Sequence, residues 1–143
     1  MTKKHSLIEI HTDGGARGNP GPAAIGVQAI SGDNTLFTLS ETIGETTNNV
    51  AEYSAVIRAL ETLRDLDITA DKTRFVLDSE LIVRQITGIY KVKQPHLQKL
   101  REKIVTLIQA LKKSKNINEL TFKTVPRALN KVADSLVNEA LDL

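Results

Sequence analysis

The chain has 143 residues, 41% hydrophobic and 25% charged, a composition that is typical of a globular protein and excludes a disordered or fibrous one. It contains no cysteine, which excludes disulfide frameworks, cysteine zinc sites and thiol nucleophiles. The net charge of +2 is unevenly distributed, because residues 1–80 hold seven Lys and Arg against twelve Asp and Glu, whereas residues 81–131 hold twelve against two. This polarity suits a polyanion-binding surface beside a metal site, although a solvated helical face explains the basic block equally well.

The sequence contains no recognisable membrane or targeting segment. Its apolar runs fall far short of the roughly 20 residues that a membrane-spanning helix needs. Glu9 interrupts the apolar run that follows the basic N-terminus, so no secretory signal forms. We therefore expect a cytoplasmic protein, not associated with membranes, that folds as a single domain over residues 1–143.

The first part of the chain predicts three strands. Residues 7–12 alternate apolar and polar side chains, and this strand is expected to end at Asp13, where a tight loop begins with two glycines and runs to Pro22. Residues 23–30 and 35–41 are typical of two further strands joined by a Ser-Gly-Asp-Asn turn. The short connections predict an antiparallel meander.

The rest of the chain predicts helices that alternate with single strands. In chain order these are a helix from Asn48 or Asn49 as its cap to residue 63, a strand at 74–77, a helix at 79–86, a basic amphipathic helix at 95–112, a strand at 120–125 and a last helix capped by Asn130. Strands linked by helices pair in parallel. The order predicts an α/β fold with a five-stranded mixed sheet, three antiparallel strands and then two parallel ones, and helices on both faces.

Carboxylates are the side chains best placed to perform chemistry. The glycines fit neither a dinucleotide-binding motif nor a P-loop, and the sequence has no metalloprotease His pair and no Gly-x-Ser-x-Gly elbow. Four acids stand at strand ends or near helix starts: Asp13, Glu52, Asp78 and Asp134. Taken singly, these acids have simpler explanations: Asp13 as a turn residue, Glu52 as an acid that suits the helix dipole, and Asp78 as the cap of the helix that begins at Ser79.

Taken together, the acids predict a metal site. Ligands of open α/β sheets bind at the carboxyl ends of the strands, where Asp13 and Asp78 would be neighbours. Two carboxylates held close together repel each other unless cations or protons intervene. A site that offers only carboxylate and water oxygens favours Mg²⁺ over zinc or copper.

Separated motifs in the sequence resemble type 1 ribonuclease H in their order. They are Thr12-Asp13-Gly14-Gly15, Gly18-Asn19-Pro20-Gly21-Pro22, Thr46-Thr47-Asn48-Asn49-Val50-Ala51-Glu52, Asp78-Ser79 and Asn130-Lys131-Val132-Ala133-Asp134. The resemblance covers essentially the whole chain and implies the ribonuclease H fold.

The resemblance also implies an activity. It predicts an endonuclease that hydrolyses the RNA strand of RNA/DNA hybrids with little sequence preference and leaves 5′-phosphate and 3′-hydroxyl ends. The family's four acidic positions, which bind two Mg²⁺ ions with Mn²⁺ as an alternative, match Asp13, Glu52, Asp78 and Asp134. Positions that match its substrate-binding residues are Gly14, Gly15, Asn19, Thr47, Asn48, Asn49 and Ser79.

Different roles are implied for these substrate-binding positions. Asn19, Asn48 and the Gly14-Gly15 backbone would approach the minor groove, where the 2′-hydroxyl distinguishes RNA from DNA. Residues Thr47 and Asn49 would hold the DNA strand, with Thr47 on a phosphate. Helix capping alone is the simpler explanation for the asparagines.

The sequence departs from the family pattern in two places. Many relatives carry a histidine in the loop before the last acidic motif, whereas this chain has Thr124-Val125-Pro126-Arg127 and resembles a branch with a Val-Pro-Arg segment. Arg127 is expected to act at the scissile region, where a guanidinium can hold a phosphate but is a poor proton shuttle; plain backbone neutralisation is the alternative. The tryptophan-bearing basic handle of some relatives is replaced by residues 90–96, so the grip on the hybrid should be weaker or differently placed.

Two alternatives to a hybrid-specific ribonuclease remain open at this point. One is a nuclease of the same fold that acts on double-stranded RNA or single-stranded DNA, and the other is a noncatalytic hybrid-binding module. The Gly-Asn-Pro-Gly and Thr-Asn-Asn motifs favour the hybrid, and the presence of all four acids disfavours a binding module, because carboxylates without metal repel phosphates. We expect a monomer that needs no protein partner.

Overall fold

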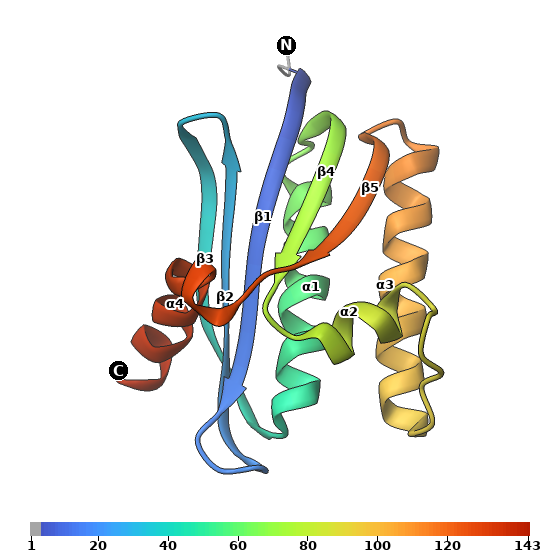
Figure 1. The fold of residues 1–143 in the computed structure, drawn as a ribbon. Helices are drawn as coiled ribbons and strands as arrows, with labels where there is room; N and C mark the ends of the chain where they lie inside the picture. The colour runs from blue at the N-terminus through green and yellow to red at the C-terminus, as the bar shows by residue number, and fades with distance from the viewer. Residues whose placement is uncertain (1–3) are drawn as a thin grey trace.

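The computed structural model describes residues 4–143 and contains one five-stranded sheet (Figure 1). The predicted domain, residues 1–143, includes three residues that lie outside this described part. The strands lie in the order β3-β2-β1-β4-β5, with β1 antiparallel to β2, β2 antiparallel to β3, and both β1–β4 and β4–β5 parallel. The predicted mixed sheet is therefore confirmed. Its strands are β1 (Lys4–Ala16), β2 (Gly21–Ser31), β3 (Asn34–Thr46), β4 (Thr69–Leu77) and β5 (Ile117–Thr124).

Helices cover both faces of the sheet, as predicted. In Figure 1, α4 lies on one face over β1, β2 and β3, and α1 and α3 lie on the other. Among residues 4–143, every helix is too short or too polar to span a bilayer. The helices are α1 (Asn48–Asp65), α2 (Glu80–Ile86), α3 (Pro95–Lys113) and α4 (Lys131–Leu141), and a short 3₁₀ helix, η1 (Arg127–Leu129), precedes α4.

β1 is longer than the sequence predicts, and the predicted loop after Asp13 is wrong. The strand continues to Ala16, and Gly14 and Gly15 pair with Ile25 and Ala24 of β2. Glycine favours turns when only local preference acts, but close packing against a neighbouring element overrides this preference. The backbone of both glycines therefore belongs to the sheet.

Two predicted capping side chains are also wrong. Thr47, not Asn48 or Asn49, caps α1, since its hydroxyl oxygen accepts a hydrogen bond from the backbone N–H of Val50 at 3.2 Å. Asp78 does not cap α2, because Ser79 fills that role and the helix begins at Glu80.

Asn130 precedes α4, but its side chain turns inward and donates to the carbonyl oxygen of Thr12 instead of capping the helix. Asn130 therefore stands at the predicted N-cap position of α4 but makes no capping hydrogen bond with its side chain. The misassigned residues make tertiary contacts that local sequence does not reveal.

The main core lies between the sheet and the α1/α3 layer. Ile8 and Ile10 of β1 and Phe75 of β4 are fully buried there against α1 side chains such as Leu60. A thinner layer lies under α4, because a Cβ at Gly26 would stand 2.2 Å from the carbonyl oxygen of Ala133. Since Gly26 pairs with Asp13, this close contact brings the start of α4 to the acid on β1.

Candidate active site

Three of the predicted acids converge at one edge of the sheet. Asp13 comes from β1, Glu52 from the first turns of α1, and Asp78 from the residue after β4; one carboxylate oxygen from each lies within 4.8 Å of the others. β1 and β4 are parallel neighbours with His11 opposite Val76, which puts Asp13 and Asp78 at the same level. The predicted proximity of these two aspartates is confirmed.

Glu52 reaches the cluster because α1 packs directly on β1. A Cβ at Gly14 would stand 2.2 Å from the carbonyl carbon of Ala51 and 2.5 Å from the backbone nitrogen of Glu52. No side chain fits in that space, since real Cβ atoms do not approach this closely. Gly14 therefore has a packing role that the sequence did not reveal.

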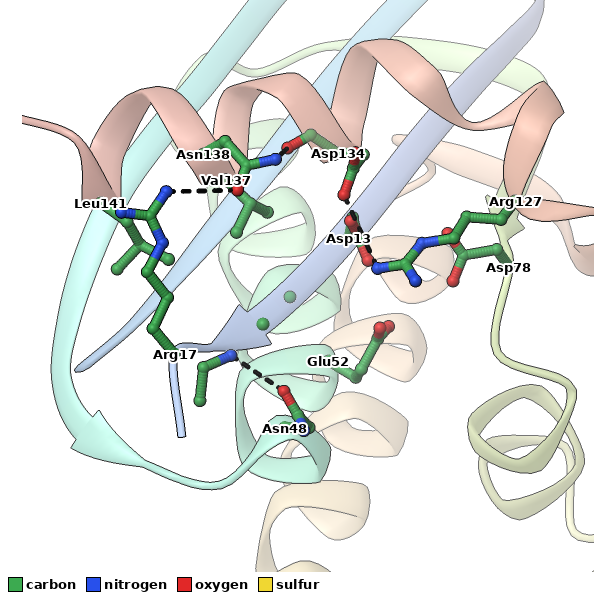
Figure 2. Close-up of a pocket in the computed structure, with 13 residues that line it drawn as sticks. Asp13, Arg17, Asn48, Glu52, Asp78, Arg127, Asp134, Val137, Asn138 and Leu141 are labelled. Atoms are coloured by element: carbon green, nitrogen blue, oxygen red, sulfur yellow. Dashed lines mark hydrogen bonds and ion pairs between the residues drawn. The ribbon is translucent and has the colours of Figure 1, made fainter. Parts of the chain in front are cut away.

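Asp134 and Arg127 complete the upper rim of the site. Asp134 lies in the first turn of α4, and Nη2 of Arg127 is 3.9 Å from its Oδ1. The Arg127 side chain is 81% exposed. Figure 2 shows both residues beside Asp13 and Asp78. The four side chains line a hollow of about 440 Å³.

Without a cation, the buried carboxylates of the cluster repel one another, and their ionised forms are disfavoured. Burial and the neighbouring charge of Asp78 raise the pKa of Asp13 to about 7. Burial and the charge of Asp13 raise the pKa of Glu52 well above its usual value. Within residues 4–143, the buried Oε2 of Glu52 has no hydrogen-bond partner. Hard oxygen donors with uncompensated negative charge fit a divalent cation.

Two of the predicted substrate-binding asparagines tie neighbouring loops together. Oδ1 of Asn19 accepts from the backbone N–H of Asn48 at 3.0 Å, and Oδ1 of Asn48 accepts from the backbone N–H of Ala16 at 2.9 Å. Because each amide oxygen is already engaged, the NH₂ group of each exposed side chain is the end available to a ligand. No local pattern in the sequence indicates this pairing.

Some of the predicted substrate-binding residues line the hollow beside the acids, and others do not. Gly14, Gly15 and Asn48 line the hollow. Among the described residues that line the hollow, four of the predicted ones are missing: Asn19, Thr47, Asn49 and Ser79. The hydroxyl oxygens of Thr47 and Ser79 accept helix-capping bonds, which leaves each O–H able to donate.

Sequence reasoning missed a polar group at the far end of the hollow. Arg17 lies on the β1–β2 loop, with Nη2 3.4 Å from Oδ1 of Asn138 (Figure 2). The same nitrogen lies 2.7 Å from Oδ1 of Asp142. It also missed the inward-facing side chains of Asn130 and His11 behind the acids. The spacing of Asn130, four residues before Asp134, was the only available signal, and it also fits a cap.

Two basic side chains of α3 contact neighbouring elements. Nε of Arg101 donates to the backbone oxygen of Gln85 at 2.8 Å, and Nζ of Lys103 lies 3.6 Å from Glu61. The Arg84 guanidinium lies 5.4 Å from the ring centre of the half-exposed Tyr90. Tyr90 therefore packs against a cation and still presents part of its ring to solvent.

Comparisons with known proteins agree on one family. The "Reverse transcriptase-like" family model matches residues 11–140. Ribonuclease HI of Halobacterium salinarum is 39% identical over 94% of this chain, and ribonuclease H of Ruthia magnifica is 36% identical over 94% of this chain and 95% of its own length. LC11-RNase H1, solved in complex with an RNA/DNA hybrid, superposes with a TM-score of 0.84 at 50% identity, covering 94% of this chain and 96% of that one.

Some relatives are considerably longer than this chain. The chain spans 64% of the Halobacterium protein and 35% of the next three curated relatives. The matched region nevertheless contains all four acids, Arg127 and the loops around them.

Proposed function

Because the chain belongs to the ribonuclease H family, we propose that it cleaves the RNA strand of RNA/DNA hybrids endonucleolytically, with little sequence preference, leaving 5′-phosphate and 3′-hydroxyl ends. The observation that carries this proposal is the convergence of Asp13, Glu52 and Asp78 to within 4.8 Å, with Asp134 on the rim. The relative LC11-RNase H1, solved with such a hybrid, supports the choice of substrate.

Asp13, Glu52, Asp78 and Asp134 would hold two Mg²⁺ ions, with Mn²⁺ as an alternative. Bound there, the ions would supply an activated water on one side of the scissile phosphate and charge stabilisation for the departing 3′ oxygen on the other. The chain's own part is to present the carboxylates as a rigid set. Because Asp13 and Glu52 are buried, their orientation is fixed by packing before substrate binds.

The loops beside the acids would recognise the duplex by shape. The NH₂ groups of Asn19 and Asn48 are oriented by the bonds to their oxygens and would donate to the RNA minor groove, where the 2′-hydroxyl distinguishes RNA from DNA. The backbone of Gly14-Gly15 lines the same hollow. Thr47 and Asn49 would hold the DNA strand, and the Ser79 hydroxyl would donate near Asp78. Such contacts to sugar and backbone explain the expected lack of sequence preference.

The test of the proposal is a cleavage assay on end-labelled RNA/DNA hybrid, double-stranded RNA and double-stranded DNA, each with Mg²⁺, Mn²⁺ or EDTA. We expect cutting of the RNA in the hybrid alone, and only with metal. Asp78→Asn, purified in the same way, should be inactive and excludes a contaminating nuclease; Asp33→Asn, in an exposed turn, should be fully active. Hybrid that is bound but left uncut would instead establish a noncatalytic binding module.

Arg127 would hold a phosphate near the rim of the hollow. Its side chain is exposed, and its 3.9 Å contact with Asp134 is loose enough to be exchanged for substrate. We expect Arg127→Ala to lower kcat/KM about tenfold, since a charge-assisted hydrogen bond contributes ~1.5 kcal/mol. Lys131→Ala, which removes another exposed charge nearby, is the matched control. If the two substitutions lowered kcat/KM equally, Arg127 would contribute only general neutralisation of the phosphate backbone and no specific contact.

We propose that the chain acts as a monomer, because all the acids of the site come from one copy. The molecular mass of the active species by light scattering tests this point. The cytoplasmic location stays a prediction from the sequence.

A further inference from the structure

Asn130 is buried behind the acid cluster, with only 1% of its surface exposed, although it stands at the start of a helix where a capping side chain is usually solvated. A buried carboxamide needs partners for both its nitrogen and its oxygen. The structure provides them. Nδ2 donates to the backbone oxygen of Thr12 at 2.9 Å and to Oδ2 of Asp78 at 3.5 Å, and Oδ1 accepts from Nδ1 of His11 at 3.2 Å.

These bonds connect Asn130 to three of the four acids. Thr12 immediately precedes Asp13 on β1, and the Asp78 carboxylate is contacted directly. The backbone N–H of Asp134 donates to the carbonyl oxygen of Asn130 at 3.2 Å. One residue thus joins the strand, the loop and the helix from which these acids project.

We propose that Asn130 and His11 are positioning residues that set the orientation of the Asp78 carboxylate for metal binding. The inference rests on the proposed function, because it assigns these residues to the same metal site. An amide oxygen can only accept, so His11 must carry its proton on Nδ1 and must face the oxygen end of Asn130. The NH₂ end is then directed at Thr12 and Asp78. A reversed amide would put its oxygen against two other acceptors.

His11 is itself held in place along the sheet. It lies two residues before Asp13 on β1, and therefore on the same face of the strand, with 20% of its side chain exposed. Its Nε2 lies 3.8 Å from Oε1 of Glu9, whose Oε2 accepts from Nη1 of Arg74 on β4 at 2.9 Å. The imidazole is four-fifths buried, so packing limits its rotation, and its Nδ1 bond can in turn restrict the rotation of Asn130.

Partners of metal-binding carboxylates fix ligand orientation, and their loss typically lowers metal affinity or activity by about 10- to 100-fold. We expect a loss of this size in Mg²⁺ affinity, measured by calorimetric titration without nucleic acid, for Asn130→Asp, which keeps the shape but replaces the donor beside Asp78 with an acceptor. His11→Phe should weaken Mg²⁺ binding in the same direction. Both variants should lower kcat with little change in the KM for hybrid.

Two further variants separate hydrogen bonding from packing. His11→Asn offers an amide nitrogen near the position of Nδ1 and should restore most of the Mg²⁺ affinity that His11→Phe loses. His5→Phe is the matched control, because His5 lies on the same strand and bonds through Nδ1 to the Ser31 hydroxyl at 2.8 Å, far from the acids. This control should bind Mg²⁺ and turn over substrate like the unmodified protein.

The proposal is overturned if Asn130→Asp and His11→Phe bind Mg²⁺ as tightly as the unmodified protein, or if His11→Asn is as impaired as His11→Phe. If Asn130→Asp fails to fold, the three histidine variants decide the question. Failure of the proposed function would look different. The unmodified protein would then bind Mg²⁺ without cutting the hybrid, and the affinities of the variants would still test the positioning role.

Discussion

Replacing Asp13 with Asn is expected to abolish cleavage and, without divalent metal at pH 8, to make the protein more stable. Asp13 is 5% exposed and lies at the centre of the acid cluster. Loss of a central ligand of the proposed metal site would remove several kcal/mol of transition-state stabilisation, or about a thousandfold or more in rate. In the metal-free protein, the buried charge of Asp13 is repelled by Asp78, and this repulsion destabilises the fold. Asn at this position removes the charge and with it the repulsion.

The effect on stability should depend on pH with a definite sign. The pKa of Asp13 is about 7 in the folded protein, against 3.8 for the free side chain, so the unfolded chain releases this proton first as the pH rises. The free energy of unfolding of the metal-free protein should therefore fall between about pH 4 and pH 7, by an amount on the order of a few kcal/mol. Glu52, whose pKa is also raised, contributes in the same direction.

Urea denaturation of metal-stripped protein from pH 4 to pH 8 measures this dependence. Asp13→Asn should flatten it relative to the unmodified protein, and Asp33→Asn should leave it unchanged. Saturating Mg²⁺ should reverse the loss of stability at pH 8, because a ligand bound only to the folded state stabilises that state. If the free energy of unfolding of Asp13→Asn depended on pH in the same way as that of the unmodified protein, the raised pKa would not belong to Asp13.

The second large effect is expected from a single methyl group at Gly14. The added Cβ would stand 2.2 Å from backbone atoms of Ala51, and backbone cannot move aside as a flexible side chain can. Gly14→Ala should therefore push α1 away from β1, lower the free energy of unfolding by about 3 kcal/mol or more, and displace Glu52 from the cluster.

Gly15→Ala is the matched control for this substitution. Its Cβ would stand 3.6 Å from Cγ1 of Val137, which is an ordinary van der Waals distance. Its free energy of unfolding should change by less than about 1 kcal/mol, measured by the same urea titration. Equal destabilisation by the two alanines would show that strand geometry, and not contact with α1, requires glycine at Gly14.

The sequence predicted the sheet and the acidic cluster because both follow from short-range patterns. Alternation along β1 and helical periodicity along α1 identify their buried faces, and the helix-linked connection makes β1 and β4 parallel. The parallel pairing is enough to place Asp13 beside Asp78. The prediction of the capping residue was wrong where several neighbouring side chains could cap the helix, as with Thr47 next to two asparagines.

The sequence by itself therefore determined the order of the strands and helices along the chain and which acids meet at the edge of the sheet. Periodicity and motif spacing are properties of neighbouring residues, so they can be recognised without the fold. Only the tertiary structure decided that Gly14 is a strand residue under α1, that Asn130 faces inward to Thr12, and that burial raises the pKa of Asp13. The physical reason is the same in each case. Steric contact, hydrogen bonding and desolvation at these positions come from residues remote in sequence, whose proximity exists only after the chain has folded.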